Sequence, residues 1–402
     1  MDITFSAEAE AYREQVREFL KDNVPQDWRG IGALAGDTHT SFLKDWTALL
    51  SKHKLLAPAW PTEYGGAGLS PEERVVLAEE FALAGVPTGD ANDEFSVDML
   101  GNTLLEHGTP EQKDYFLPRI LSKEIVFCQG FSEPDAGSDL SNVRTKATLE
   151  GDHWVVDGQK IWTSDGLKAN WIFALVRTEP GSVRHHGLTM MLIPIDQPGV
   201  ELRPIKMITG DSEFCETFFT QAVTERGHVV GEVGDGWKVA MSLLGHERGE
   251  TAVVLPLRFS AELDRLVALI DERGLSDDPK VRVGVAECQA RLSAMRLLGL
   301  RNVSSWVKGM QPGPESSIAK LVWSEYHVQS STLGMEVLGS DGLVAEGRPG
   351  PAYYSDEPGA DPLHTASWQT TYFTALGSVI YGGTSEIQRN IVAERVLGLP
   401  RS

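Results

Sequence analysis

A pair of glycines followed by hydroxyl and carboxylate side chains is the segment of this chain best suited to hold a ligand. Residues 381–390 read YGGTSEIQRN. The two glycines let the backbone approach a flat or phosphorylated ligand closely, because they carry no side chain. Thr384, Ser385 and Glu386 can cap a helix whose N-terminus favours an anion. On its own, the segment fits either a ligand site or an ordinary loop-to-helix cap.

Two segments upstream of residues 381–390 also contain hydroxyl, carboxylate and glycine residues close together. Residues 131–139 read FSEPDAGSD, and residues 156–166 read VDGQKIWTSDG. In order and approximate spacing, the three segments resemble the signature sequences of acyl-CoA dehydrogenases, and the resemblance covers nearly the whole chain. The first segment also holds Glu133, Asp135 and Asp139, but its Ser-Glu-Pro-Asp-Ala-Gly sequence is more typical of a capped, solvated loop. We therefore expect no metal site there.

The resemblance implies an FAD-dependent dehydrogenation of an acyl-CoA thioester to the trans-2-enoyl-CoA. A carboxylate removes the α-proton, N5 of FAD accepts the β-hydride, and hydrogen-bond donors stabilise the charge on the thioester oxygen. It also implies an electron-transfer flavoprotein or a similar acceptor. The assembly it implies is a tetramer, either of identical chains or with a related chain.

The position of the catalytic base distinguishes two groups of this family. Many members carry a glutamate directly after the signature tyrosine, where this chain has Gly382. A second group carries the base on the first long helix of the C-terminal domain, just before an arginine. This match assigns the base to Glu247 and places Arg248 beside the substrate. At Gly382 the resemblance implies that the backbone N–H, together with the ribityl 2′-hydroxyl of FAD, binds the thioester oxygen.

The hydrophobic pattern around Glu247 agrees with this assignment. On a helix from about residue 237 to 255, Glu247 shares one face with Ala240, Leu243, Thr251 and Val254. A carboxylate within such a stripe is desolvated, which raises its pKa towards that of a useful base. The pattern leaves open a buried glutamate that an arginine neutralises in a structural ion pair.

The resemblance also assigns residues to the flavin ring. Phe131 and Ser132 would lie along the ring edge, and Trp162 would stack on the ring or flank it. Ser164 would place its hydroxyl near N5, and Ser138 matches a position that contacts acyl-CoA. For Trp162, the residue pattern leaves open an aromatic side chain that fills the core of the β domain.

Two segments depart from the family pattern on the side of the FAD diphosphate and adenine. The family string Arg-x-x-Phe-Gly is replaced by residues 271–280, DERGLSDDPK, in which Arg273 is the matching arginine. The family string Gln-x-x-Gly-Gly-x-Gly is replaced by residues 336–342, EVLGSDG, in which Glu336 replaces the glutamine and Gly339 is retained. Both changes add negative charge near a diphosphate, which predicts weak FAD binding or a contribution from a partner chain.

Other features bear on the substrate and on the alternatives. The pattern resembles a subgroup of actinobacterial acyl-CoA dehydrogenases, some of which act as mixed tetramers on bulky steroid side-chain thioesters. A base at Glu247 leaves space at Gly382, which fits a substrate that is branched or bulky near the thioester. Thr384 and Glu386, assigned to FAD by the resemblance, predict that the chain keeps its own flavin. Two alternatives remain: a non-catalytic partner subunit of a heteromeric dehydrogenase, and a flavin oxidase or monooxygenase on the same fold.

Hydrophobic periodicity and turn residues predict a helical, then β, then helical chain. Capping boxes with proline at the first helical position begin at Ser70 and Thr109. Residues 154–162 predict a hairpin with Asp157 and Gly158 at its turn. The expected fold is therefore α+β, with a central β-barrel or sandwich between two helical domains, as the resemblance also implies. The expected domains are a helical domain at 1–122, a β domain at 123–233 and a four-helix bundle at 234–402.

Composition limits the classes of partner. The chain has 402 residues, of which 41% are hydrophobic, and a formal net charge of −21. That charge argues against nucleic acid, and an anionic coenzyme A would need a local cationic pocket. There is no run of eighteen apolar residues and no basic, apolar leader, so we expect neither a membrane span nor a signal peptide. The three cysteines form no disulfide framework or metal spacing, which favours the cytoplasm.

Overall fold

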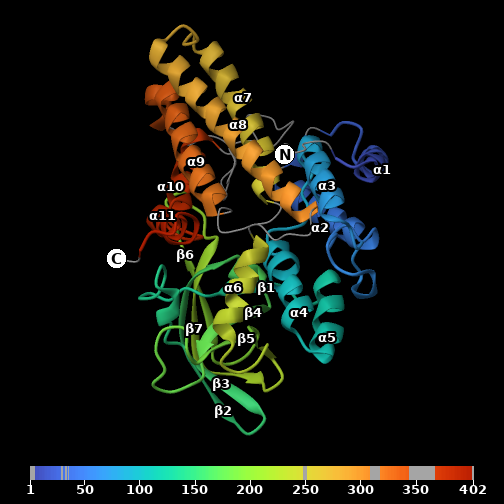
Figure 1. Cartoon of the computed structure of the whole chain (residues 1–402), viewed down its shortest axis with the longest axis vertical. Helices are drawn as coiled ribbons and strands as arrows, with labels where there is room; N and C mark the ends of the chain where they lie inside the picture. The colour runs from blue at the N-terminus through green and yellow to red at the C-terminus, as the bar shows by residue number, and fades with distance from the viewer. Residues whose placement is uncertain are drawn as a thin grey trace.

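The computed structural model describes residues 5–28, 30–31, 34, 36–247, 251–307, 317–343 and 367–400. Helices at both ends of the chain flank a β domain in the middle (Figure 1), which confirms the expected α+β fold. Residues 345–362, whose prolines and glycines predict an irregular loop, lie outside the described residues. No described helix is both long enough and apolar enough to cross a membrane.

The N-terminal part is helical, and local sequence signals set its boundaries. Both capping boxes form as expected: the Glu73 N–H donates to Ser70 Oγ at 3.3 Å, and the Gln112 N–H donates to Thr109 Oγ1 at 3.3 Å. The helices of this part are α1 (Ala7–Asn23), α2 (Gly36–Lys52), α3 (Pro71–Ala84), the π-helix η3 (Glu94–Gly101), α4 (Asn102–His107) and α5 (Pro110–Leu121).

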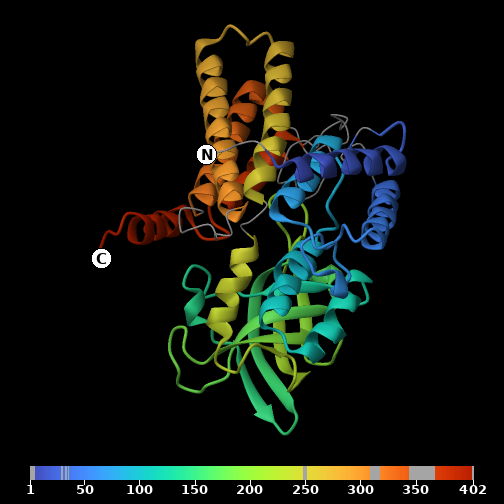
Figure 2. The ribbon, with the colours of Figure 1, turned by 45° about the vertical axis from the view of Figure 1, so that its right-hand side comes forward.

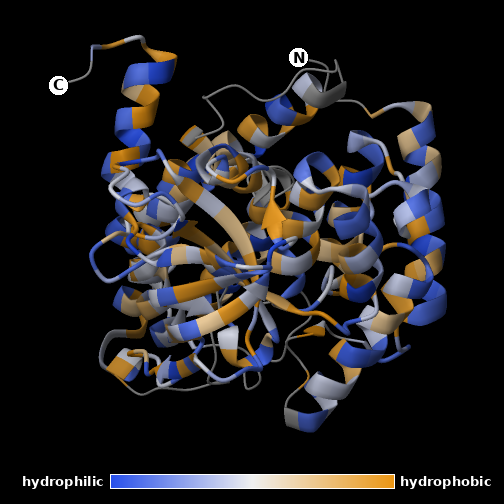
Figure 3. Ribbon diagram, turned by 90° about the horizontal axis from the view of Figure 1, so that it is seen from below, coloured by the Kyte–Doolittle hydropathy of each residue, from blue (hydrophilic) through white to orange (hydrophobic). Residues whose placement is uncertain are grey.

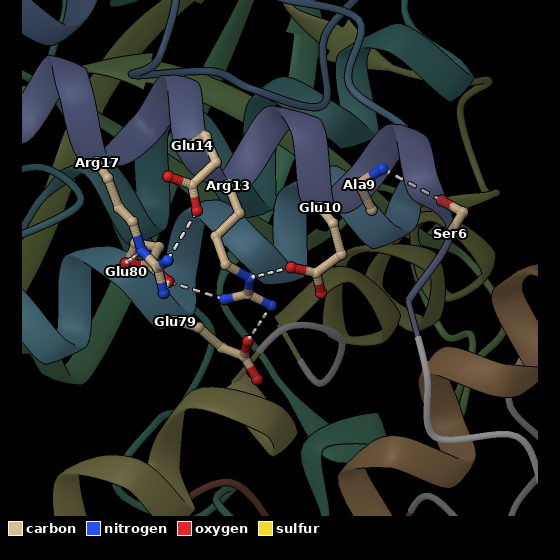
Figure 4. A network of polar contacts seen from close by, with 8 residues as sticks. All are labelled: Ser6, Ala9, Glu10, Arg13, Glu14, Arg17, Glu79 and Glu80. Carbon is tan, nitrogen blue, oxygen red and sulfur yellow. Dashed lines mark hydrogen bonds and ion pairs between the residues drawn. The ribbon is translucent and has the colours of Figure 1, made fainter.

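A charged network joins α1 to α3 (Figure 4). The Arg13 guanidinium donates to Glu80 Oε1 at 2.8 Å and to Glu79 Oε2 at 3.1 Å. Arg17 Nε donates to Glu80 Oε2 at 3.0 Å. Burial on its own raises the pKa of Glu80, but the two arginines bring the net shift below its ordinary value. Glu80 therefore stays ionised and holds both arginines of α1 against α3.

The described strands form one eight-stranded sheet in which most neighbours are antiparallel. The strand order is β6-β7-β3-β2-β4-β5-β8, and β1 pairs with β4 in parallel. The strands are β1 (Phe127–Gly130), β2 (Lys146–Glu150), β3 (His153–Ser164), β4 (Trp171–Arg177), β5 (Leu188–Pro194), β6 (Val200–Ile205), β7 (Phe214–Glu225) and β8 (Val229–Val230).

The predicted hairpin over residues 154–162 is wrong. These residues belong to the single strand β3, which pairs with β7, and the turn before β3 contains Gly151 at φ +64°. Gly158 instead marks a shift of register against β7, with φ +152°. A Cβ atom at Gly158 would lie 2.5 Å from Thr145 Oγ1, so the close approach of the residue before β2 also leaves no room for a side chain here. An Asp-Gly pair serves a bulge here as readily as a turn, because both need a residue that tolerates unusual backbone angles.

The C-terminal part contains a helical bundle. Helices α7, α8, α9 and α10 surround an apolar core that includes Phe259, Leu266, Cys288 and Tyr326. Hydrophobic and hydrophilic residues alternate around the outer helices (Figure 3), as expected when one face packs inward. The elements are α6 (Gly236–Glu247), α7 (Thr251–Glu272), α8 (Pro279–Val307), α9 (Ser317–Leu338), η7 (Gly339–Leu343), α10 (Trp368–Ser378), α11 (Ser385–Ile391) and the π-helix η8 (Val392–Val396).

Helix α6 packs on the sheet rather than in the bundle. Val239, Ala240 and Leu243 are buried in the same apolar cluster as residues of β4 and β5. Figures 1 and 2 show α6 beside the strands, while the turn between α7 and α8 lies at the end of the bundle far from the sheet. The single helix expected over about 237–255 is therefore described as two helices, with residues 248–250 outside the described part.

The charged network between α1 and α3 predicts a large difference between two glutamates. Glu80→Ala removes the shared acceptor of two arginines and should lower the free energy of unfolding by about 3 kcal/mol. Glu14→Ala is the matched control, because Glu14 bonds Arg17 from a side chain that is 71% exposed, and it should cost less than about 1 kcal/mol. Urea unfolding of both variants measures the difference, and equal effects would contradict it.

Candidate active site

The segment after β1 runs beside the end of β3 and brings two sequence motifs together. The Ile161 N–H donates to the Ser132 carbonyl at 2.9 Å. The Phe131 ring is buried and packs edge-on against Phe173 of β4, with ring centroids 5.9 Å apart. Trp162 and Ser164 follow Ile161 on the same strand, so the residues assigned to the flavin ring come from two adjacent segments.

A buried lysine ties these two segments to the sheet. Lys160 is fully buried, and its Nζ donates to Glu133 Oε1 at 2.8 Å, to the Phe131 carbonyl at 3.1 Å and to the Leu175 carbonyl at 2.7 Å. The Glu133 carboxylate also accepts from the two backbone N–H groups of 144–145, at 2.6 and 2.9 Å. Three acceptors satisfy the three donors of the ammonium group. The expectation that Glu133 lies in a solvated loop is therefore wrong.

The pair stays charged near neutral pH. Burial lowers the pKa of Lys160 to about 8, and Glu133 opposes that shift. Burial raises the pKa of Glu133, but Lys160 and the backbone donors bring the net shift below its ordinary value. A lysine that is still protonated at pH 7 thus faces an ionised glutamate inside the β domain.

Trp162 is held outward on an unusual backbone. Its φ is +60°, and the register between β3 and β7 shifts between Lys160 and Thr163. Its side chain is 55% exposed, with one edge contact to Phe214 at a centroid distance of 5.8 Å. A bulky residue in the left-handed region is strained, and such strain concentrates at functional sites. The alternative that Trp162 fills the core of the β domain is wrong.

Ser164 and Ser138 lie at the borders of this region. Ser164 is the last residue of β3 and pairs in register with Phe214 of β7. Ser138 is exposed in the loop after the tight turn that Glu133 and Ala136 close through backbone hydrogen bonds of 3.0 and 3.1 Å. Ser138 is exposed, whereas Ser164 is half-buried.

A polar cluster that the sequence did not reveal lies next to Ser164. The Asn92 amide donates to the Phe127 carbonyl at 3.1 Å and to the Asp165 carbonyl at 3.4 Å. Lys123 Nζ donates to Asp90 Oδ2 at 2.9 Å and also contacts Asp93. This cluster fixes the segment before η3 against β1 and against the residue that follows Ser164.

The proposed base lies at the end of α6. Glu247 is the last residue of that helix, and Ala240 and Leu243, which share its predicted face, are fully buried. The Glu247 side chain and the whole of Arg248 lie outside the described residues. Helix α6 as a whole contacts β5 and η3, and Glu247 follows at its C-terminal end.

The C-terminal signature forms a turn between α10 and α11. Gly382 and Gly383 have φ of +62° and +91°, which glycine adopts without steric cost. Thr384 caps α11, because its Oγ1 accepts from the Ile387 N–H at 3.2 Å. The pKa of Glu386, in the first helical turn, is lowered by its own backbone N–H and by the Thr384 hydroxyl.

The residues assigned to the diphosphate and adenine lie elsewhere. Arg273 follows α7 and bonds Asp341 of η7 at 2.5 Å, and Glu336 pairs with Lys280 at 3.0 Å. Gly339 begins η7 with φ +57°. Arg273 lies in the turn between α7 and α8, at the end of the bundle far from the sheet (Figure 2). The structure does not bring these residues together with Trp162 in one chain.

No group of three His, Cys, Asp or Glu side chains in the described part of the chain is arranged to hold a metal ion. Cys128, Cys215 and Cys288 are buried free thiols.

The Lys160–Glu133 pair predicts a strong effect on stability. Lys160→Met leaves a buried carboxylate without its counter-charge and should lower the free energy of unfolding by about 3–5 kcal/mol. Lys146→Met is the control, because its Nζ lies 3.9 Å from Asp157 and its side chain is 67% exposed. The control should change stability by less than about 1 kcal/mol. Chemical denaturation of both variants tests this, and a mild effect of Lys160→Met would contradict it.

The cluster around Asp93 predicts a pH effect. Burial raises the pKa of Asp93 to about 6, with a further rise from Asp90 that Lys123 opposes. Because the folded pKa lies above the ordinary 3.8, the stabilising contribution is complete below about pH 4 and is lost as the pH rises through about 6. Asp93→Asn mimics the protonated form, so it should be nearly neutral at pH 4 and stabilising by about 1–3 kcal/mol at pH 8.

Urea unfolding at pH 4 and pH 8 measures that difference, with the exposed Asp114→Asn as control. If Asp93→Asn raises the free energy of unfolding by the same amount at both pH values, the raised pKa of Asp93 would be contradicted.

Family models match most of the chain in three consecutive segments. The family models for the acyl-CoA dehydrogenase N-terminal, middle and C-terminal domains match residues 6–124, 128–222 and 234–397. The chain is 43% identical to acyl-CoA dehydrogenase IpdE1 of Mycolicibacterium smegmatis, over 98% of both chains. It is 42% identical to the protein of the same name from Mycobacterium tuberculosis, also over 98% of both.

Solved structures agree with these sequence relatives. A structure titled Tcur3481-Tcur3483 steroid ACAD superposes with a TM-score of 0.81 at 30% identity, covering all of both chains. The ChsE4-ChsE5 complex from Mycobacterium tuberculosis superposes with a TM-score of 0.79 at 29% identity, also over all of both chains. The chain therefore belongs to the acyl-CoA dehydrogenase family, whose members are FAD-dependent oxidoreductases.

Proposed function

We propose that this chain oxidises an acyl-CoA thioester to the trans-2-enoyl-CoA, with Glu247 as the base and the Gly382 N–H as a donor to the thioester oxygen. The observation that carries the proposal is Trp162, an indole that is 55% exposed on strained backbone. A bulky residue held at positive φ is strained, and such strain concentrates at functional sites, where a flat ligand would cover the exposed ring. The Ser132 and Ser164 positions border the same strand end.

The residues at this strand end fit the isoalloxazine ring of FAD. When bound there, FAD supplies the acceptor for the β-hydride. Trp162 would lie against the ring or flank it, Phe131 and Ser132 would follow its edge, and Ser164 would donate its hydroxyl. Ser138 lies exposed on the neighbouring loop, where it would contact the acyl-CoA.

The residues proposed to remove the α-proton and to stabilise the resulting charge come from the C-terminal helical part of the chain. Glu247 ends α6, a helix whose inner face is packed on the sheet, and its carboxylate would accept the α-proton. Loss of the α-proton moves charge onto the thioester oxygen, and a preorganised backbone donor at Gly382 stabilises that charge. Arg248, directly after the base, would lie beside the substrate and favour the ionised carboxylate.

The residues at the end of the bundle away from the sheet favour an assembly of several chains. Arg273 lies in the turn between α7 and α8, at the end of the bundle away from the sheet (Figure 2), and we propose that Arg273, Glu336 and Gly339 serve the diphosphate and adenine of a neighbouring chain's FAD. Arg273 would have to exchange its bond with Asp341 for one with the diphosphate. We therefore propose a tetramer, either of identical chains or with a related chain.

The α11 end of the chain would complete the FAD site. The Thr384 hydroxyl and the Glu386 carboxylate lie at the same helix N-terminus. Because Glu386 is an acceptor that already occupies this helix end, it suits a hydroxyl or amino group of FAD rather than a phosphate.

The relatives point to the substrate class. Two of the superposed structures are titled as a steroid enzyme and as a complex of two different chains. Gly382 leaves space where many family members carry a glutamate side chain, so we propose a substrate that is bulky or branched near the thioester, such as a steroid side-chain thioester. Electrons would pass to an electron-transfer flavoprotein or similar acceptor, and the buried free thiols suit a cytoplasmic enzyme.

Glu247→Gln tests the role of the base. The variant keeps the shape of the side chain but cannot accept the α-proton, so turnover should fall by several orders of magnitude, about 10²–10⁴-fold or more. Flavin content per chain and acyl-CoA binding should stay near those of the unmodified protein. Anaerobic bleaching of the flavin absorbance by acyl-CoA measures the step directly.

Bleaching at a near-normal rate by Glu247→Gln would place the base elsewhere. If the unmodified chain, purified without any partner, binds no flavin even when FAD is added, the interpretation as a non-catalytic partner subunit is favoured. Fast oxygen consumption by the reduced protein would favour the oxidase or monooxygenase.

A further inference from the structure

The turn that carries Gly382 is fixed at its start by α9. Lys320 is 8% exposed, and its Nζ donates to the Ser378 carbonyl at 2.8 Å, at the end of α10. The same Nζ lies 6.0 Å from the centroid of the Tyr381 ring. The Ser385 N–H donates to the Val379 carbonyl at 3.1 Å and closes the turn across its base.

A second contact reaches the backbone carbonyl of Gly382. Gln388 of α11 is fully buried, and its Nε2 donates to the Gly382 carbonyl at 2.9 Å. Gly383, between them, has φ +91°, and a Cβ atom there would lie 2.6 Å from Gln388 Nε2. The turn thus takes this path only with glycine at 383 and with the amide of Gln388 folded back against it.

The two backbone polar groups of Gly382 differ: its carbonyl accepts a hydrogen bond from Gln388, and its N–H remains available to a ligand. No acceptor for the Gly382 N–H lies among the described residues, and Gly382 is exposed. Gln388 Oε1 is buried and likewise has no partner in the described part of the chain. Burying an unpartnered amide oxygen is unfavourable, so packing alone would favour an apolar side chain at position 388.

We infer that Gln388 is a positioning residue for the reaction: by holding the Gly382 carbonyl, it fixes the backbone angles of Gly382, and these set the direction in which the N–H of the preceding peptide group, that of Gly382, points toward the thioester oxygen. This inference rests on the proposed function, and it goes beyond it by assigning the orientation of the donor to a side chain that does not touch the substrate. Fixing the donor before the charge develops is what makes such a hydrogen bond effective in the transition state. A donor displaced by about 1 Å costs about 10²-fold in rate.

Two variants of Gln388 test this inference in the FAD-loaded enzyme. Gln388→Met keeps volume and burial but removes the donor, and kcat should fall about 10²-fold with little change in KM. Gln388→Glu is isosteric, and its ionised carboxylate repels the Gly382 carbonyl, so kcat should fall at pH 8. A buried glutamic acid that becomes protonated regains a donor, so the ratio of variant to unmodified kcat should rise again towards pH 6.

The carbonyl stretching frequency of a bound, non-reactive acyl-CoA analogue labelled with ¹³C at the thioester distinguishes positioning from packing. A purely structural role of Gln388 would leave this frequency unchanged. Binding should lower this frequency in the unmodified enzyme and in Asn390→Ala, an exposed control on the same helix. The lowering should be smaller in both Gln388 variants. Melting temperature and flavin content show whether each variant is folded, and Gln388→Glu alone decides the matter if Gln388→Met does not fold.

The outcomes separate the two claims. Unchanged kcat and an unchanged carbonyl shift in a folded Gln388 variant would overturn the inference while the proposed function stands. A carbonyl shift that depends on Gln388, in an enzyme that does not dehydrogenate any acyl-CoA, would uphold the inference and overturn the proposed reaction. A loss of rate in Gln388→Glu that is the same at pH 6 and pH 8, with an unchanged carbonyl shift, would assign Gln388 to packing only.

Discussion

The ion pair between Lys160 and Glu133 is the constraint on which the site depends. It lies between β3 and the segment after β1, and it fixes the carbonyl of Phe131 as well as the carboxylate. Moving two charges into the sheet domain costs free energy that only full hydrogen bonding offsets, and here each donor of the ammonium has an acceptor. The pair therefore sets one relative position of the two segments, and the exposed Trp162 owes its place to that position.

Local signals in the sequence were enough for the helices and for the order of the elements. The capping boxes at Ser70 and Thr109 form because each depends on residues three positions apart. The hairpin at Gly158 was predicted wrongly because a turn and a bulge need the same backbone freedom, and only the pairing with β7 separates them. Similarly, Glu133 looks like a loop carboxylate until Lys160, 27 residues later, is placed beside it.

For the site, sequence resemblance supplied the residues but not their arrangement. It could not show that Arg273 and Glu336 are each bonded to a charged residue of their own chain, because these contacts join elements far apart in the sequence. It also could not show the contact of Gln388 with Gly382, since a glutamine on a short helix carries no signal of where its amide is directed. Both facts follow from how the chain packs, and packing is where single-sequence patterns contain least information.

The replacement of a glutamate by Gly382 has a physical consequence beyond the loss of a base. A side chain at this position would have to coexist with φ +62°, with the folded-back amide of Gln388, and with a bound thioester. Glycine removes the side chain and leaves only the backbone of residue 382, whose carbonyl Gln388 holds. In the proposed reaction the turn would then serve only to orient a hydrogen-bond donor, and the proton transfer would pass to Glu247 at the end of α6, on a different element. Separating the two tasks would let substrate fill the space above Gly382, which would suit a thioester too bulky for a site that carries both on one turn.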